Sequence, residues 1–193
     1  MTYDPDRHHR RSIRLKEHDY AEPGAYFVTT CTRERESLFG HVVYGEMRLN
    51  DAGEIARRCW EDIPDHFPLA ELDAFVIMPN HVHGIIVVPG KGTACRALTS
   101  EQFGKPSVGS VPTIVRSYKS SVTRHMNLLR GAPGTPLWLR NYYEHIVRSE
   151  AELMAIREYI ISNPARWDED ENNPALMNPG VMDHESTRGN NAA

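Results

Sequence analysis

Residues 73–88 read DAFVIMPNHVHGIIVV, and the fold is most readily inferred from this stretch. Two runs rich in β-branched and aromatic residues, 72–78 and 81–88, are separated by Pro79 and Asn80, a pair typical of a turn. The pattern predicts a tight antiparallel hairpin. Because successive side chains of a strand point to opposite faces, His81 and His83 share one face of the predicted sheet.

The flanking segments extend this hairpin into an α+β pattern. Ser149 and Glu152 form an S-x-x-E capping box ahead of an apolar stripe, which predicts a last helix that ends at Pro164. The order β-α-β-β-α-β followed by a helix is the split βαβ, ferredoxin-like pattern. It predicts an antiparallel sheet with two helices on one face and the other face free for a ligand. The remaining expected elements are strands at 25–31 and 137–147, a ribbon at 41–49 that turns near Gly45, helices at 51–64 and 114–129, and a loop at 89–112.

Length and composition restrict the class of protein. The chain has 193 residues, about one domain, and its 40% apolar and 25% charged residues argue against disorder throughout. A TIM-barrel hydrolase is excluded by the length. The three cysteines lie far apart, so no disulfide framework or zinc ribbon is expected and a cytoplasmic location fits. The longest apolar run, 74–78, has five residues, which predicts no membrane segment.

The formal charge of −4 argues weakly against a nucleic-acid partner, but it is unevenly distributed. Residues 168–193 hold six acids and one base, and without them 21 bases face 20 acids. The expected organisation is a basic N-terminal arm (1–24), a catalytic domain (25–167) and an acidic, loosely ordered tail (168–193).

Two weak local signals point to chemistry. His81 and His83 could chelate one divalent cation, or they could be ordinary surface or half-buried histidines. Tyr159 and Asn163 are four residues apart and project from the same side of the last helix. A nucleophile and a metal ligand would suit that spacing, although a tyrosine beside an apolar stripe and an asparagine before proline are also common structural features. Tyr142 and Tyr143 are interpreted as packing or base-stacking residues.

Four segments together resemble the single-tyrosine HUH transposases. They are AYFVTTCTRERESLFG (25–40), DAFVIMPNHVHGIIVV (73–88), LWLRNYYEHIV (137–147) and IREYIISNPARW (156–167). The combination of MPNHVHG with YIxxNP is more specific than either part. Within that family the sequence is most similar to the REP-associated tyrosine transposases, relatives of the small insertion-sequence transposases. The resemblance covers about residues 10–167.

The resemblance implies cleavage and rejoining of single-stranded DNA on a ferredoxin-like fold. It makes His81 and His83 the HUH pair, Tyr159 the catalytic tyrosine and Asn163 the third metal-ligand position, where some relatives use glutamine. Tyr159 would attack a phosphodiester and form a 5′-phosphotyrosine. A magnesium or manganese ion would stabilise the charge that develops on the phosphate. The implied targets are palindromic repeats that fold into hairpins.

Basic side chains are the natural contacts for such DNA. The alternatives are a catalytically inactive hairpin-binding module of the same fold and an RNA-binding ferredoxin-like domain, which would carry aromatic residues where strand 81–88 has histidines. The sequence leaves open whether the protein is a homodimer. The DNA-binding candidates, chosen from charge alone, are Arg10, Arg11, Arg14, Arg116, Lys119, Arg124 and Arg140.

Overall fold

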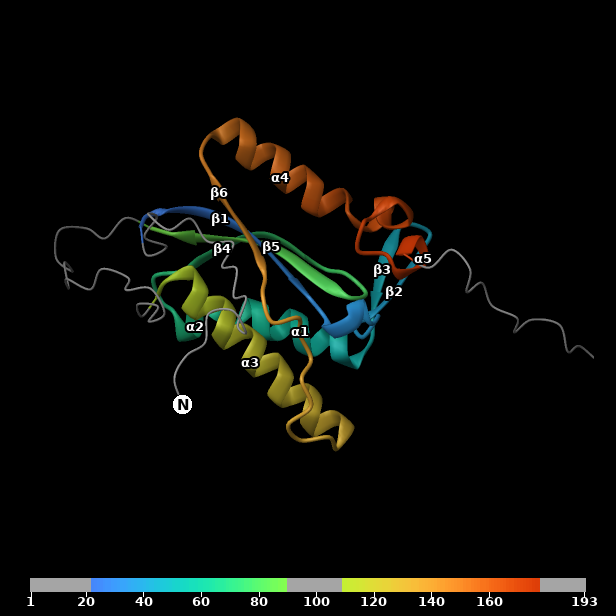
Figure 1. The fold of residues 1–193 in the computed structure, drawn as a ribbon. Helices are drawn as coiled ribbons and strands as arrows, with labels where there is room; N and C mark the ends of the chain where they lie inside the picture. Colours follow the sequence, from blue (N-terminus) through green and yellow to red (C-terminus); the bar gives the residue numbers. More distant parts are fainter. Residues whose placement is uncertain (1–21, 90–108, 178–193) are drawn as a thin grey trace, which may run out of the picture.

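The computed structural model describes residues 22–89 and 109–177. Its centre is a four-stranded antiparallel sheet in the order β4-β5-β1-β6, accompanied by a two-stranded ribbon, β2-β3. Helices α1 and α3 lie on one side of the sheet and α4 lies on the other (Figure 1). The expected α+β, ferredoxin-like fold is confirmed. The strands are β1 (Gly24–Cys31), β2 (Gly40–Val43), β3 (Glu46–Leu49), β4 (Glu71–Ile77), β5 (His81–Val88) and β6 (Tyr143–Val147), and the helices are α1 (Asp51–Glu61), α2 (Ile63–His66), α3 (Val111–Arg130), α4 (Glu150–Ser162) and α5 (Pro174–Met177), with 3-10 helices η1 (Arg33–Arg35) and η2 (Pro164–Glu169).

The main apolar core lies between the sheet and helices α1 and α3. Trp60 of α1 and Tyr118 of α3 are fully buried there, edge to face with ring centroids 5.1 Å apart. Trp60 also rests on β5 at Gly84, where a Cβ atom would lie 2.2 Å from Trp60 Cζ2. The glycine after the second histidine is therefore needed for the packing of α1 against the sheet.

The opposite face of the sheet is partly covered by α4, which corrects the expectation of a free face. Ile160 packs against Phe27 and Ile85 in a second, smaller cluster of buried residues, and Leu153 and Ile156 lie at its edge. The predicted cap is present, since the Ser149 hydroxyl accepts a hydrogen bond from the Glu152 amide. The end of β5 that carries the histidines is covered as well, because Trp167 of η2 lies beside His81.

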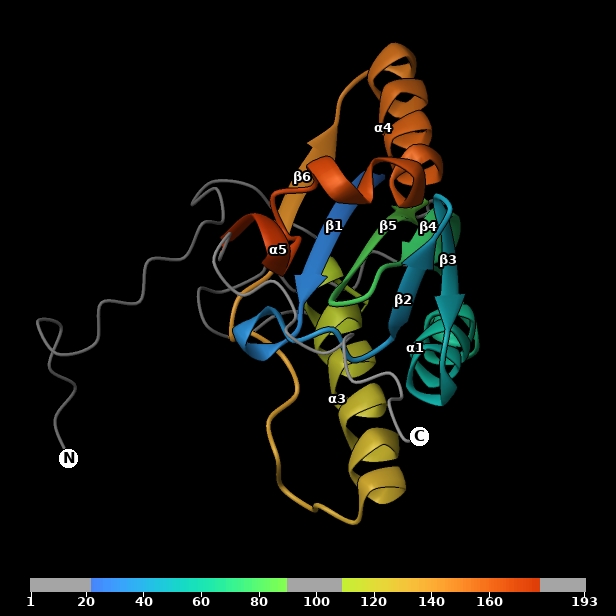
Figure 2. The same ribbon diagram turned by 90° about the vertical axis from the view of Figure 1, so that its right-hand side faces the viewer.

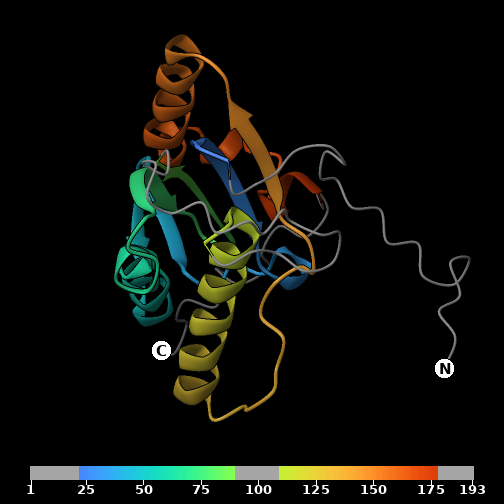
Figure 3. The ribbon, with the colours of Figure 1, turned by 90° about the vertical axis from the view of Figure 1, so that its left-hand side faces the viewer.

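The strand expected at 137–147 is shorter than predicted. Only Tyr143–Val147 forms β6, and the chain runs to it from α3 in an irregular path (Figure 3). Lys119 Nζ donates to the carbonyl oxygens of Leu139 and Asn141, at 2.6 and 3.4 Å. Residues 137–139 still pair beside the end of β1, through a bridge between Trp138 and Thr32 and a hydrogen bond from the Leu139 amide to the Cys31 carbonyl oxygen, but they form no continuous strand with β6.

The end of the folded unit also differs from the expected boundary at 167. Helix η2 runs through Trp167 to Glu169, and α5 follows at Pro174–Met177 (Figure 2). Asp170, Asn172 and Asn173 between them are buried. Residues 168–177 therefore belong to the folded unit and are not part of a solvated tail. The arm at 1–21 and the rest of the predicted tail, 178–193, lie outside the described residues.

The predicted ribbon and hairpin are both present. Strands β2 and β3 pair from Gly40 with Leu49 to Val43 with Glu46, which leaves a two-residue turn at Tyr44 and Gly45.

In the part of the chain that the structure covers, none of the helices combines the length and apolar character needed to cross a membrane.

Candidate functional site

The two histidines lie on the same face of the central strand β5, as predicted. The exposed fraction is 0% for His81 and 3% for His83, because β1 and β4 flank β5 and α4 and η2 lie above it. Their ring centroids are 4.4 Å apart. Two imidazoles at this separation in a buried setting are unusual for a stability core, since each loses hydration on burial.

Hydrogen bonds fix both rings by their Nδ1 atoms. His81 Nδ1 lies 2.8 Å from Asn80 Oδ1, which can only accept, so the proton of the neutral ring is on Nδ1. Asn80 is itself held, because its amide donates to the carbonyl oxygens of Arg35 and Asn172. The Thr29 hydroxyl pairs with His83 Nδ1 at 2.7 Å. With Nδ1 engaged in both rings, Nε2 of His81 has no hydrogen-bond partner among the described residues, whereas Nε2 of His83 lies 3.3 Å from the Tyr159 hydroxyl.

The surroundings keep both imidazoles neutral. Burial, together with the positive charge of Arg35, lowers the pKa of His81 to about 3, and the nearby Asn163 amide opposes this only in part. Burial and the neighbouring His81 lower the pKa of His83 well below its usual value. A neutral imidazole is the form that coordinates a metal ion.

A carboxylate completes the cluster. One ligand atom from each of His81, His83 and Asp170 lies within 4.8 Å of the others, and Asp170 Oδ2 is 3.9 Å from His81 Nε2. Two hydrogen bonds position the Asp170 carboxylate. Its Oδ2 atom accepts from Asn163 Nδ2 at 3.1 Å, and its Oδ1 atom accepts from the backbone N–H of Asn172 at 2.6 Å. The segment that follows η2 thus places its acid against the histidines of β5.

Two acceptor atoms at this point lack a donor. Within the described residues, His81 Nε2 and Asn163 Oδ1 are both buried without a hydrogen-bond partner. Burial of a lone pair without a partner costs free energy, and a cation would satisfy both atoms together with Asp170. Two imidazole nitrogens with carboxylate and amide oxygens fit a magnesium or manganese ion.

Tyr159 lies beside this cluster. Its hydroxyl is 3.3 Å from His83 Nε2, although the two residues are 76 positions apart in the chain. The ring packs edge-on against Phe27 and His83, with centroids 6.1 and 5.2 Å away, and is 37% exposed. Burial and then the charges of Asp170 and Glu171 raise the pKa of the phenol. A phenol in this setting needs a nearby positive charge to act as a nucleophile.

The four residues singled out from the sequence, His81, His83, Tyr159 and Asn163, are therefore brought together. The side-chain nitrogen of Asn163 donates a hydrogen bond to Asp170, so the Oδ1 atom of Asn163 is the one left without a partner among the described residues. Asp170 itself was missed, because its acid-rich surroundings were interpreted as a solvated tail. The run of Asp and Asn ahead of Pro174 was the available signal, since such residues form side-chain-closed turns.

The predicted DNA-binding residues lie elsewhere. Arg116 and Arg124 are exposed on α3, across the sheet from α4 and the histidines, and Arg140 is exposed in the segment after α3. Lys119 donates to backbone carbonyl oxygens, and burial lowers its pKa to about 8. The N-terminal candidates Arg10, Arg11 and Arg14 fall outside the described residues.

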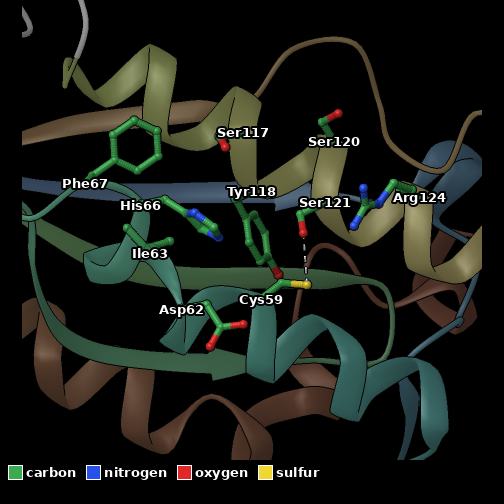
Figure 4. Close-up of a pocket in the computed structure, with 10 residues that line it drawn as sticks. All are labelled: Cys59, Asp62, Ile63, His66, Phe67, Ser117, Tyr118, Ser120, Ser121 and Arg124. Atoms are coloured by element: carbon green, nitrogen blue, oxygen red, sulfur yellow. Dashed lines mark hydrogen bonds between the residues drawn. The ribbon is translucent and has the colours of Figure 1, made fainter.

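A pocket of about 270 Å³ lies between α1, α2 and α3 (Figure 4). Its lining includes Tyr118, Cys59, His66 and Arg124, and Cys59 Sγ is 3.5 Å from Ser121 Oγ. None of the clustered residues of β5, α4 or η2 takes part in it. The pocket is therefore separate from the candidate site.

Comparisons with known proteins support the fold. No family model matches the chain. An uncharacterized protein of Haemophilus influenzae is 42% identical over 174 residues, which are 88% of this chain and 96% of that protein. A candidate REP-associated tyrosine transposase of the same organism is 23% identical over 151 residues, 77% of this chain and 74% of that protein. A solved structure of a REP-associated tyrosine transposase bound to a REP hairpin has a TM-score of 0.55 at 19% identity. The alignment covers 80% of this chain and 74% of the chain in that structure. The resemblance expected from the sequence is confirmed.

Proposed function

The chain belongs to the same family as the Haemophilus influenzae protein that is 42% identical to it, and it has the fold of a REP-associated tyrosine transposase; on that basis we propose a function. The protein is a metal-dependent endonuclease and strand transferase for single-stranded DNA, and it acts on hairpin-forming palindromic repeats. The observation that carries the proposal is the Tyr159 hydroxyl, 3.3 Å from His83 Nε2 beside a second neutral imidazole and a carboxylate.

Tyr159 is the nucleophile of the proposed reaction. Its oxygen forms a bond to the phosphorus of a phosphodiester while the bond from phosphorus to the 3′ oxygen breaks. The phenol loses its proton and the departing 3′ oxygen gains one. The products are a 5′-phosphotyrosine and a free 3′-hydroxyl, and attack by another 3′-hydroxyl reverses the step. The covalent link retains the energy of the phosphodiester, so rejoining requires no ATP.

His81, His83 and Asp170 would hold the metal ion, with Asn163 Oδ1 as a further oxygen ligand. A bound magnesium or manganese ion supplies positive charge that polarises the phosphate and stabilises its developing charge. The protein contributes orientation: Asn80 and Thr29 fix the imidazole rings, and Asn163 and the Asn172 amide fix the carboxylate.

The class of DNA follows from the relative that was solved with a REP hairpin. The exposed arginines Arg116, Arg124 and Arg140 have no hydrogen bond or ion pair within the described residues and are proposed, with Arg10, Arg11 and Arg14, to contact phosphates. Phosphate contacts of this kind give affinity that falls as salt is raised.

Covalent capture tests the proposal. The protein is incubated with a labelled single-stranded oligonucleotide that folds into a hairpin with single-stranded flanks, in Mg²⁺, Mn²⁺ or EDTA, and the adduct is resolved under denaturing conditions. We expect an adduct that requires the metal, is lost in Tyr159→Phe and persists in Tyr143→Phe, an exposed tyrosine on the same face of the sheet.

An adduct that persists unchanged in Tyr159→Phe would contradict the assignment of the nucleophile. Hairpin binding without any adduct, under either metal, would instead establish the inactive binding module.

A further inference from the structure

The tip of the β2-β3 ribbon carries an aromatic residue at a position that is costly for it. Tyr44 has φ 52° and Gly45 has φ 77°, so both turn residues are in the left-handed region, as a type I′ turn requires. Asn, Asp or Gly normally fills the first of these positions, because a larger side chain is strained there. Such strain is a recurrent feature of functional positions.

The Tyr44 ring gains no packing in return. It is fully exposed (102%), and it makes no ring contact or hydrogen bond with another described residue. A position that costs backbone strain and contributes nothing to packing is more readily explained by a ligand than by the fold.

The ribbon tip is anchored next to the candidate site. A Cβ atom at Gly45 would lie 3.3 Å from the Cα of Ala165 in η2, a tight contact that, together with φ 77°, favours glycine here. Ala165 follows Asn163 by two residues, and Trp167 of the same helix lies 6.0 Å from His81, ring centroid to ring centroid. Figure 2 shows the β2-β3 tip beside the end of α4 and η2.

We propose that Tyr44 is a stacking platform for a base of the single strand that flanks the cleaved phosphodiester. This inference rests on the proposed function and deepens it. A flat ring with both faces open suits a nucleobase, and stacking on it tolerates different bases. Arg166, next to Ala165, has a side chain that is 62% exposed; its ion pair with Glu169, at 3.9 Å, is also exposed, and a phosphate of the same strand would compete for this charge.

The test distinguishes the contribution of the Tyr44 ring to DNA binding from its effect on the turn. In a Tyr159→Phe parent, which binds without cleaving, Tyr44→Asn removes the ring and supplies a preferred type I′ residue, whereas Tyr44→Phe keeps the ring. Affinity is measured at fixed salt with a hairpin oligonucleotide that carries 2-aminopurine in its single-stranded flank, and melting temperature is measured in parallel. Leu128→Asn, an exposed apolar position on α3, serves as a matched control.

We expect Tyr44→Asn to raise the melting temperature and to weaken binding by about 5- to 150-fold, the range for loss of one base stack. Tyr44→Phe and Leu128→Asn should bind as the parent does. Unchanged affinity in Tyr44→Asn would overturn the stacking role and leave the proposed function standing, and a joint fall of affinity and melting temperature would overturn it in favour of a structural role. A parent that binds no hairpin DNA would overturn both.

Discussion

The two faces of β5 lie in very different surroundings. Val82 and Ile86 point into the large apolar core with Trp60, whereas His81 and His83 point toward α4 and η2 among polar groups. The large core supplies the hydrophobic free energy that offsets the cost of burying two imidazoles and a carboxylate on the other face. Stability and chemistry are therefore divided within one strand, and neighbouring positions should respond to substitution in different ways.

The largest contrast is expected between His81→Ala and Ile86→Ala. At a Mn²⁺ concentration about 100 times the dissociation constant, the parent should gain about 2.7 kcal/mol of stability. His81→Ala should lose this gain and the covalent adduct. Ile86→Ala should keep both while its free energy of unfolding falls by about 2–5 kcal/mol. Thermal melts with and without Mn²⁺ measure this, and a His81→Ala protein that still gained stability from Mn²⁺ would refute the division.

A second contrast involves Gly84. This residue lies on the core face of β5 and stands between His83 and Ile86 in the sequence. A methyl group there meets Trp60 Cζ2, so Gly84→Ala should cost about 1–3 kcal/mol of unfolding free energy. Trp60→Phe removes that atom, and the double variant should therefore lose less than the two single variants combined. Urea unfolding of all four proteins gives the coupling energy, and strict additivity would show that the contact is not the cause.

On the chemical face, Asp170→Asn tests the residue that completes the cluster. Loss of its charge should weaken Mn²⁺ binding by at least about 10- to 100-fold, the range found when even an outer partner of a metal ligand is removed. Glu171→Gln, its exposed neighbour, is the control. Calorimetric titration measures both, and equal dissociation constants for Asp170→Asn and the parent would remove Asp170 from the ligand set.

The smallest effect is expected where α4 is tied to β4. Arg157 forms two hydrogen bonds with Asp73, at 2.6 and 2.9 Å, and lowers the pKa of that carboxyl below 3.8. The ion pair therefore stabilises the protein at pH values above about 4 and ceases to do so as Asp73 becomes protonated. Asp73→Asn should cost about 0.5–1 kcal/mol at neutral pH, because Arg157 is partly exposed. Its difference from the parent should shrink as the pH falls below about 4, and a difference that did not depend on pH would need another cause.

Local patterns in the sequence were sufficient for much of the fold. The alternation and the Pro79-Asn80 turn gave β5 its observed limits, and the capping box gave the start of α4. The strand expected at 137–147 was too long because β propensity does not report where pairing is interrupted: residues 137–139 make only an isolated bridge, and Lys119 of another element bonds to the carbonyl oxygens that follow.

The site was only partly predictable for a similar reason. His81, His83, Tyr159 and Asn163 carry periodic or motif signals, so they could be named from the sequence. Asp170 acts through a turn whose hydrogen bonds come from its own neighbours and from Asn163, and composition alone makes such a segment look solvated.

The alternation along β5 also makes the length of this segment more restrictive than its composition. One residue inserted between Pro79 and His81 would turn both imidazoles toward Trp60 and present Val82 to Asp170. Two inserted residues would restore the face but shift a histidine one pleat along the strand, away from Thr29 and Asn80. An insertion or deletion next to the histidines would therefore remove the site even if the sheet still formed.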